Sequence, residues 1–427
     1  AVDHDLNILN GGNISSSTFA TGNTGNLDIS AKELLINKQE SENMTGIFSF
    51  AHSGSGGNIG SMTINSGTSL SLLNGGRIMS TTNSFGDAGG MIVKSEGLIS
   101  LSNGGNIGSS TLSLGDAGGI DITAKELLID GQGGTGTGTI TSISSVAHSG
   151  SNGNAGNIIM NIEDSLTLLN GGYISSSTGS FGHAGTIIVK SEGLLSLLNG
   201  AFINSGTSSL GGGGTIDITV GDLLIDGMGE PTAIASMANF NSEGKAGDII
   251  IKSEGSLTLL NQGLISTNAF SIGDAGNIDI NVREMLIDGV EGTASAGISS
   301  SSLSGDSKGK SGNISVNSEG SLTLINRGEI FSSTDSPRNA GDVTIKSGGL
   351  LSLLNGAQIN SSTFSSGNAG TIDISARELL IDGQGGFTSI ASSVLPDSNG
   401  HAGNIKVNTE NKITLSNGGN LQITNFS

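Results

Sequence analysis

Carboxylates recur at a fixed place in this 427-residue sequence, and paired carboxylates are the groups with which many enzymes cleave polysaccharides. One aspartate in each of five repeated segments occupies this place: Asp28, Asp121, Asp217, Asp279 and Asp373. Cleavage needs two such groups side by side, or a calcium ion with a basic residue nearby. Aromatic residues, the usual platforms for sugar rings, make up only 3% of the chain, and no stretch breaks the repeat to gather acidic residues. We therefore expect no enzymatic activity and no catalytic residue.

Histidines and glycine runs are the other residues that could serve chemistry. The five histidines have no metal-ligand spacing: His4, His52, His148, His183 and His401. His183 and His401 replace the second residue of a glycine-rich tetrad, so a turn is their expected place. The runs "GTGTGT" (134–139) and "GGGG" (211–214) lack the Lys-Ser and helix that complete a phosphate loop. We expect no metal site and no cofactor.

A repeat positions all of these residues. The tetrad, of the form G-x-A-G, marks thirteen copies, separated by intervals of 35, 29, 29, 38, 29, 29, 33, 29, 36, 29, 29 and 33 residues. A fixed period of this size predicts a solenoid, in which each repeat is one coil. The unit is 29 residues, and the longer units, with inserted loops, lie near residues 22–56, 115–152, 211–243, 273–308 and 367–399.

Apolar residues alternate with period two inside each unit. In "GDIIIKSEGSLTLLNQGLIS" (247–266) the alternation predicts three short strands, with turns at "KSEG" and at the Asn-Gly-like pair between the second and third strands. No segment carries a helical apolar stripe. We therefore expect an all-β fold, a right-handed parallel β-helix of about 13 coils that forms one continuous domain over residues 1–427.

Two sets of side chains keep one register from unit to unit. Asparagines before the third strand predict a structural ladder of stacked amides: Asn10, Asn74, Asn103, Asn170, Asn199, Asn261, Asn326, Asn355 and Asn417. Phenylalanines just before the tetrad predict buried packing at a corner of the coil: Phe19, Phe85, Phe181, Phe270 and Phe364.

The long units predict a surface feature. Their strand-one aspartates should face solvent and pair with a base of the same unit, namely Lys32, Lys125, Arg283 or Arg377. All five insertions follow the second strand, which places them on one side of the solenoid. Loops such as "GQGGTGTGTITSISSVAHSG" (131–150) could then form a row of protrusions that contacts a partner.

Charge and composition exclude several classes of partner. The net charge of −20, with scattered Lys and Arg, argues against nucleic acid and anionic membranes. No stretch approaches 18 consecutive apolar residues, so no membrane span is expected.

The combination of "GNAGxIxI", "LSLLNGGxISSST" and "ELLIDGQGG" resembles the repeat regions of filamentous-haemagglutinin-type exoproteins of Gram-negative bacteria, especially cyanobacteria, which are exported by two-partner secretion. The resemblance covers essentially the whole chain, although the amino-terminal secretion domain of that family is not evident. It implies a β-helix outside the cell or on its outer surface, serving adhesion, biofilm or envelope structure.

A non-catalytic structural or adhesive rod is therefore the expected function, with head-to-tail self-association and cell-surface or matrix glycans as partners. Two alternatives stay open at this point. One is a carbohydrate-active β-helix enzyme. The other is an ice, mineral or glycan binder that uses Ser/Thr rows of the third strand, such as 14–18, 174–178 and 359–363.

Overall fold

The computed structural model describes residues 4–131, 140–240, 242–270, 272–290, 295–303, 308–395 and 398–425. The chain divides into two compact units, Ala1–Asp217 and Ile218–Ser427. The expectation of one continuous domain stays a prediction.

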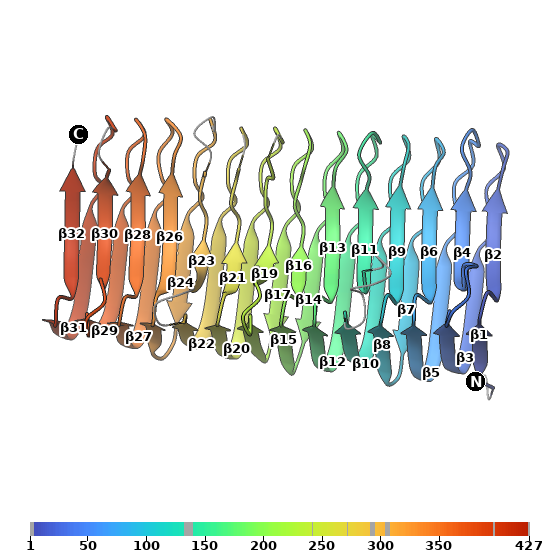
Figure 1. Ribbon diagram of the computed structural model, residues 1–427, viewed down its shortest axis with the longest axis horizontal. Helices are drawn as coiled ribbons and strands as arrows, with labels where there is room; N and C mark the ends of the chain where they lie inside the picture. Colours follow the sequence, from blue (N-terminus) through green and yellow to red (C-terminus); the bar gives the residue numbers. More distant parts are fainter. Residues whose placement is uncertain are drawn as a thin grey trace. The chain divides into compact units, whose positions relative to one another are not determined.

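Both units are parallel β-solenoids, as the period-two pattern predicted. Successive coils lie about 31 residues apart, with about 13 turns in the chain and no helix among the described residues. In each unit the strands form two parallel sheets, drawn as two rows of arrows in Figure 1.

The first unit has one sheet for the first two predicted strands of each coil and another for the third. The first sheet contains β1 (Leu6–Leu9), β3 (Leu27–Asn37), β5 (Met62–Leu73), β7 (Met91–Ser95), β8 (Leu98–Ser102), β10 (Ile120–Asp130), β12 (Ile158–Leu169), β14 (Ile187–Ser191) and β15 (Leu194–Leu198). The second contains β2 (Asn13–Thr18), β4 (Gly46–Ala51), β6 (Arg77–Thr82), β9 (Asn106–Thr111), β11 (Ser142–Ala147), β13 (Tyr173–Thr178) and β16 (Phe202–Asn204).

The second unit repeats this plan, and β17 (Ile216–Val220) contains the boundary between the units. Its first sheet contains β18 (Asp222–Asp226), β20 (Ile249–Leu260), β22 (Ile278–Asp288), β24 (Ile314–Ser318), β25 (Leu322–Ile325), β27 (Val343–Leu354), β29 (Ile372–Asp382) and β31 (Ile405–Ser416). Its second contains β19 (Thr232–Ala235), β21 (Gly263–Ser266), β23 (Ala296–Ser299), β26 (Gly328–Thr334), β28 (Gln358–Thr363), β30 (Ser389–Val394) and β32 (Asn420–Asn425).

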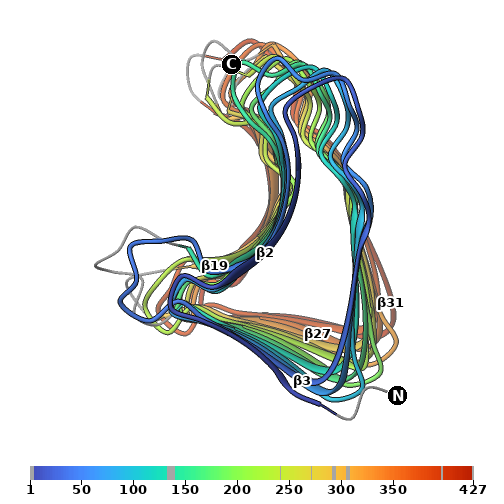
Figure 2. The same cartoon turned by 90° about the vertical axis from the view of Figure 1, so that its right-hand side faces the viewer.

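The first and second strands of a coil often run on as one bent strand. β3 and β27 are examples, and the end-on view of Figure 2 shows such strands turning a corner. Where a long coil meets a short one the register shifts at this bend, because Ala31 pairs with Ser66 but Glu33 pairs with Ser69. Long coils therefore have one residue fewer at the bend.

Stacked aliphatic side chains fill the inside of each coil. Ile122, Ile129 and Ile143 of one coil are each 0% exposed, and so are their partners in the preceding coil, Val93, Leu101 and Ile107. The buried apolar residues are mostly aliphatic, as the composition required, although Phe48 is only 2% exposed. Burial of each aliphatic side chain contributes about 1.5–3 kcal/mol.

The inserted residues do not all lie where the sequence placed them. Extra residues do follow the second strand, as in the loop 38–45 between β3 and β4, at the corner where Figure 2 shows the protruding loops. The same coil is also longer after its third strand: residues 52–61 join β4 to β5, whereas 83–90 join β6 to β7. The prediction of a single insertion site was wrong because an interval between tetrads measures only the net change in length.

Candidate functional site

The asparagine ladder lies at the turn between the second and third strands. All nine predicted members have backbone φ between 45° and 52°, which asparagine tolerates better than most residues. Asn199 Nδ2 donates to Asn170 Oδ1 over 2.8 Å, and Asn355 Nδ2 donates to Asn326 Oδ1 over 2.8 Å. Neighbouring short coils are thus joined through their side-chain amides.

Sequence reasoning missed that long coils contribute a different residue to this ladder. There the last residue of the second strand accepts the bond: Asn37, Asp130, Asp226, Asp288 or Asp382. The signal was the Asp of "IDG". A carboxylate accepts hydrogen bonds but does not donate them, so the row of amides restarts at each of these aspartates. The bond from Asn417 holds the pKa of Asp382 below its usual value.

The direction of the ladder predicts unequal effects of one substitution at two neighbouring positions. Asn74 Nδ2 donates to Asn37 Oδ1 over 3.0 Å, and that oxygen also accepts the Gln39 N–H over 3.1 Å. Asn74→Asp removes the donor and sets a carboxylate against this oxygen, so we expect it to lower the free energy of unfolding by about 1–2 kcal/mol. Asn37→Asp keeps both acceptor roles and should change it by less than about 0.5 kcal/mol. Urea unfolding measures both variants, which carry the same net charge; equal losses would contradict the ladder.

The glycines of the tetrad allow coils to approach closely. A Cβ at Gly276 would lie 2.0 Å from Gly247 O, and one at Gly115 would lie 2.0 Å from Gly86 O. Contacts under 3 Å are not possible without movement of the backbone, so a side chain is excluded at these glycines. The restriction is not general, because Arg338 stands at the first position of its tetrad and a Cβ at Gly22 or Gly25 would meet no atom within 4 Å. The third position holds small buried residues, such as Ala88 and Ala275, exposed by 7% and 8%.

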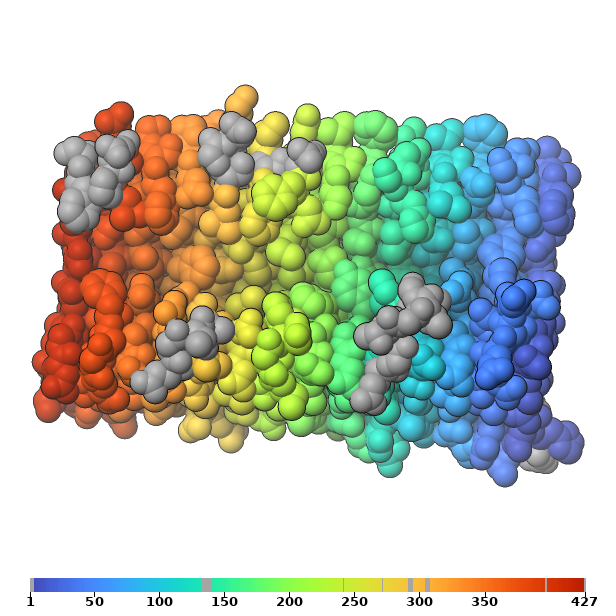
Figure 3. Space-filling view, in the orientation of Figure 1, coloured from blue at the N-terminus to red at the C-terminus, as the bar shows by residue number. Residues whose placement is uncertain are grey.

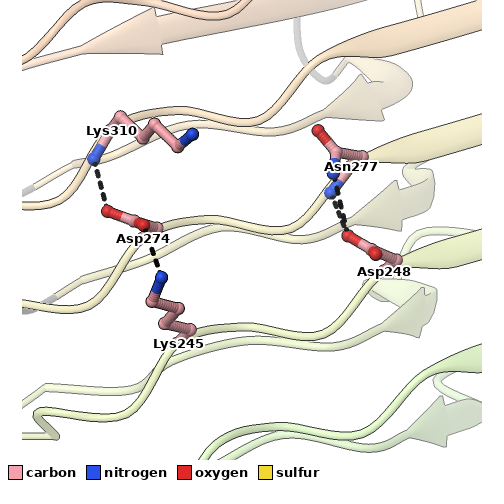
Figure 4. A network of polar contacts seen from close by, with 5 residues as sticks. All are labelled: Lys245, Asp248, Asp274, Asn277 and Lys310. Carbon is pink, nitrogen blue, oxygen red and sulfur yellow. Dashed lines mark hydrogen bonds and ion pairs between the residues drawn. The ribbon is translucent and has the colours of Figure 1, made fainter.

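The second tetrad position supplies an acceptor for the next coil. Asp274 Oδ1 accepts the Lys310 N–H over 3.1 Å, and Asp248, just after another tetrad, accepts the Asn277 N–H over 2.6 Å (Figure 4). His183 does the same, since its Nδ1 accepts the Gly212 N–H over 2.9 Å. His183 is therefore a turn residue, as the sequence predicted. His401 lies in the same place, where its N–H donates to Asn368 Oδ1 over 3.0 Å.

Half of the hydroxyls in the third strand point into the solenoid. In the row 359–363, Ser361 Oγ donates to Gly341 O over 2.8 Å and accepts the Gly370 N–H over 2.9 Å. In the row 174–178, Ser176 makes the equivalent bonds to Gly156 O and Gly185 N, and Thr178 Oγ1 donates to Gly182 O. These groups satisfy the tetrad backbone and are absent from the surface. The rows therefore offer fewer hydroxyls to an ice or mineral lattice than the sequence suggested.

The phenylalanines near the tetrad are not buried, so that expectation was wrong. Phe19, Phe85, Phe181 and Phe364 are 73%, 68%, 61% and 55% exposed. Phe270 is half-buried beside Phe240, with ring centroids 5.1 Å apart. The cause is the alternation of the strand: the inward place is taken by the preceding threonine in Thr363-Phe364, which is 0% exposed, so the ring turns outward.

The strand-one aspartates face solvent, but the expected pairing within a unit was wrong. Asp28, Asp121 and Asp279 are exposed, and Asp217 and Asp373 are half-buried. The described ion pairs join adjacent coils instead: Lys125 with Asp164 at 3.6 Å, Arg377 with Glu410 at 3.8 Å and Lys406 with Asp373 at 3.1 Å. Side chains on a strand lie closer to the next coil than to residues four further along their own strand. Exposed pairs of this kind contribute about 0–1 kcal/mol.

One pocket combines a ring with several polar side chains. It has a volume of about 450 Å³ and lies in the second unit, where the loop 383–388 meets the turns of the two preceding coils. Its lining comprises Arg327, Asn355, Gly356, Gln358, Gln384, Gly385, Gly386 and Phe387. Phe387 is 61% exposed. A larger depression of about 560 Å³ in the first unit, over Gly90 and Gly119, has no aromatic residue in its lining.

Glu329 lies beside this pocket on β26, paired in register with Gln358. Burial raises the pKa of its carboxyl, and the charge of Arg327 opposes that rise. The folded state therefore favours protonated Glu329, and this contribution to stability is lost as pH rises through the folded-state pKa. One carboxyl group with a raised pKa does not make the pair of carboxyl groups that glycoside hydrolysis uses.

Glu329→Gln should accordingly stabilise the protein at neutral pH and have little effect below the pKa of a free glutamate. The control is Asp382→Asn, since the lowered pKa of Asp382 means that its contribution is lost as pH falls. Thermal melts from pH 3 to 8 should show the two variants diverging from the parent in opposite directions. A Glu329→Gln effect that does not change with pH would contradict the assignment.

Other chemistry finds no support in the described ranges. They contain no group of three or more His, Cys, Asp or Glu side chains placed to hold a metal ion. They contain no helix long and apolar enough to cross a membrane. Residues 132–139, which include the whole run "GTGTGT" and part of the predicted protrusion 131–150, lie outside the described residues.

Comparisons with models of known families, with curated proteins and with solved structures found no match.

Proposed function

We propose that this chain is a non-catalytic structural and adhesive repeat protein, which associates end to end through its open coils and contacts glycans outside the cell. The observation that carries the proposal is the apolar surface of β31 in the second unit, which matches the buried apolar side chains of the coil stacked on it. Ile413 and Leu415 of β31 are each 44% exposed, whereas Leu379 and Ile381, their partners in β29, are 1% and 0% exposed.

Both sheets can be continued beyond this coil. Among the described residues β31 pairs with β29 and β32 with β30, and a further coil of the same shape would pair with their other sides. An open strand edge with apolar side chains is a template for further pairing. A second copy of the chain carries coils of the right shape, and a head-to-tail contact of this kind does not close.

Use of the polar groups supports a structural rather than a catalytic role. Most of the polar side chains that recur from coil to coil, namely the ladder asparagines, the tetrad acceptors and the inward serines, bond to the neighbouring coil. The inward Ser80 is an exception, because its buried hydroxyl has no partner among the described residues. The resemblance of the repeat to filamentous-haemagglutinin-type exoproteins is the reason for placing the protein outside a Gram-negative cell. No specific observation favours a carbohydrate-active enzyme.

Sedimentation velocity over a range of concentrations tests the association. We expect the parent chain to form larger species as concentration rises, and the double variant Ile413→Glu/Leu415→Glu to stay as single chains. Asn404→Glu/Asn408→Glu is the matched control, because both residues are exposed and add the same charge to the outside of the same coil. A parent chain that stays single at every concentration, or a control that dissociates as fully as the edge variant, would overturn the proposal.

A further inference from the structure

Arg327 occupies a backbone conformation that glycine adopts in most other coils. It follows Asn326 in the turn and has φ of 65°, where Gly75, Gly104 and Gly356 have φ between 83° and 84°. A residue with a side chain is disfavoured there, and Gln262, which follows Asn261, is the other example at this turn, with φ of 72°. Strained positions of this kind cluster at ligand sites, and of these two residues Arg327 is the one that lines the pocket described above.

The structure places this strained arginine in the pocket already described. Its neighbours there are the amides of Gln358, Gln384 and Asn355 and the ring of Phe387, which is 61% exposed. The charge of Arg327 acts on the nearby Glu329, but among the described residues no carboxylate lies within ion-pairing distance of the Arg327 guanidinium. The guanidinium can therefore donate hydrogen bonds to a ligand.

We infer that this pocket binds a sugar ring of a neutral polysaccharide. Guanidinium and amide groups present several donors and acceptors in one plane, which suits the adjacent hydroxyls of a pyranose. The exposed face of Phe387 offers apolar surface for the C–H groups of the same ring. A cavity of about 450 Å³ is within the range of ligand pockets.

Charge selects the neutral class of glycan. The chain carries a net charge of −20, which repels a polyanion at long range. One arginine does not offset that field. A polyuronate is therefore a poor ligand, whereas an uncharged glucan meets no repulsion.

The inference deepens the adhesive part of the proposed function and rests on it. Isothermal titration calorimetry with cellohexaose, maltohexaose and hexagalacturonate as probes tests it on the full chain. We expect one of the two neutral glucans to bind, and Phe387→Ala and Arg327→Gly each to raise its Kd about tenfold or more. Arg327→Gly should also raise the melting temperature, because glycine relieves the strained turn.

Phe364→Ala is the matched control, because it removes an exposed phenylalanine of the same unit outside the pocket and should leave Kd unchanged. The inference is overturned by the absence of binding of both neutral glucans at millimolar concentration, by tighter binding of hexagalacturonate, or by an equal loss in Phe364→Ala. Sedimentation of the same samples separates the two proposals. If the chains associate but no glucan binds, the inferred binding at the pocket is refuted and the proposed structural role stands.

Discussion

Gly185→Ala should lower the free energy of unfolding by about 3 kcal/mol, which is among the largest effects expected of a single methyl group in this chain. The new Cβ would lie 2.3 Å from Gly156 O and 2.7 Å from Ser176 Oγ. Neither group can move away cheaply, since Ser176 Oγ is the bridge between Gly156 O and Gly185 N. The coils would have to separate at the tetrad, which would weaken the bonds of Ser176 to both Gly156 and Gly185.

Gly25→Ala is the control for this prediction. Gly25 is at the fourth position of a tetrad in the same unit, but no atom lies within 4 Å of the place where its Cβ would stand. We expect its substitution to change stability by less than about 0.5 kcal/mol, or to increase it slightly by restricting the unfolded chain. Guanidinium unfolding of both variants decides the matter, and equal stabilities would show that close stacking at the tetrad does not constrain the sequence.

Ser361→Ala should lower the free energy of unfolding by about 2–4 kcal/mol. Its hydroxyl is 0% exposed and is the partner of both Gly341 O and Gly370 N–H. Alanine leaves two buried backbone groups without a partner, and each such group costs about 1–3 kcal/mol.

The neighbouring residue provides the control for that substitution. Ser362 points to the other face of β28, and its hydroxyl bonds to the Asn360 side chain, which is half-buried and can turn to water. Ser362→Ala should therefore change stability by less than about 1 kcal/mol. A larger loss at Ser362 than at Ser361 would mean that the hydroxyls of the third strand serve the surface after all.

Alternation within strands was enough to predict most of the fold. Ile359 points inward, so parity alone places Ser361 and Thr363 inward with it, and the serine bridges could have been predicted by extending the pattern past the apolar residue. Positive φ at Asn10 and Asn417 also followed from the Asn-Gly pairs. Both features depend only on residues that are adjacent in the sequence, so the sequence alone is enough to predict them.

Features set by the neighbouring coil were not predictable in that way. The partner of Lys125 is Asp164 of the next coil, and the position of that coil depends on the register shift at the bend. The pocket at Phe387 depends on how one insertion loop folds over turns about 30 and 60 residues before it, which no periodic pattern encodes. The outward face of the third strand and its loops, turned to the viewer in Figure 3, is assembled from several coils in this manner.

Cryo-electron microscopy of the assembled chain tests the central claim most directly. We expect filaments in which β31 and β32 of one copy pair with the first coil of the next, so that the spacing of about 4.8 Å between strands continues across each junction. Copies that associate side by side, with β31 and β32 open to solvent, or particles that remain single at high concentration, would contradict it.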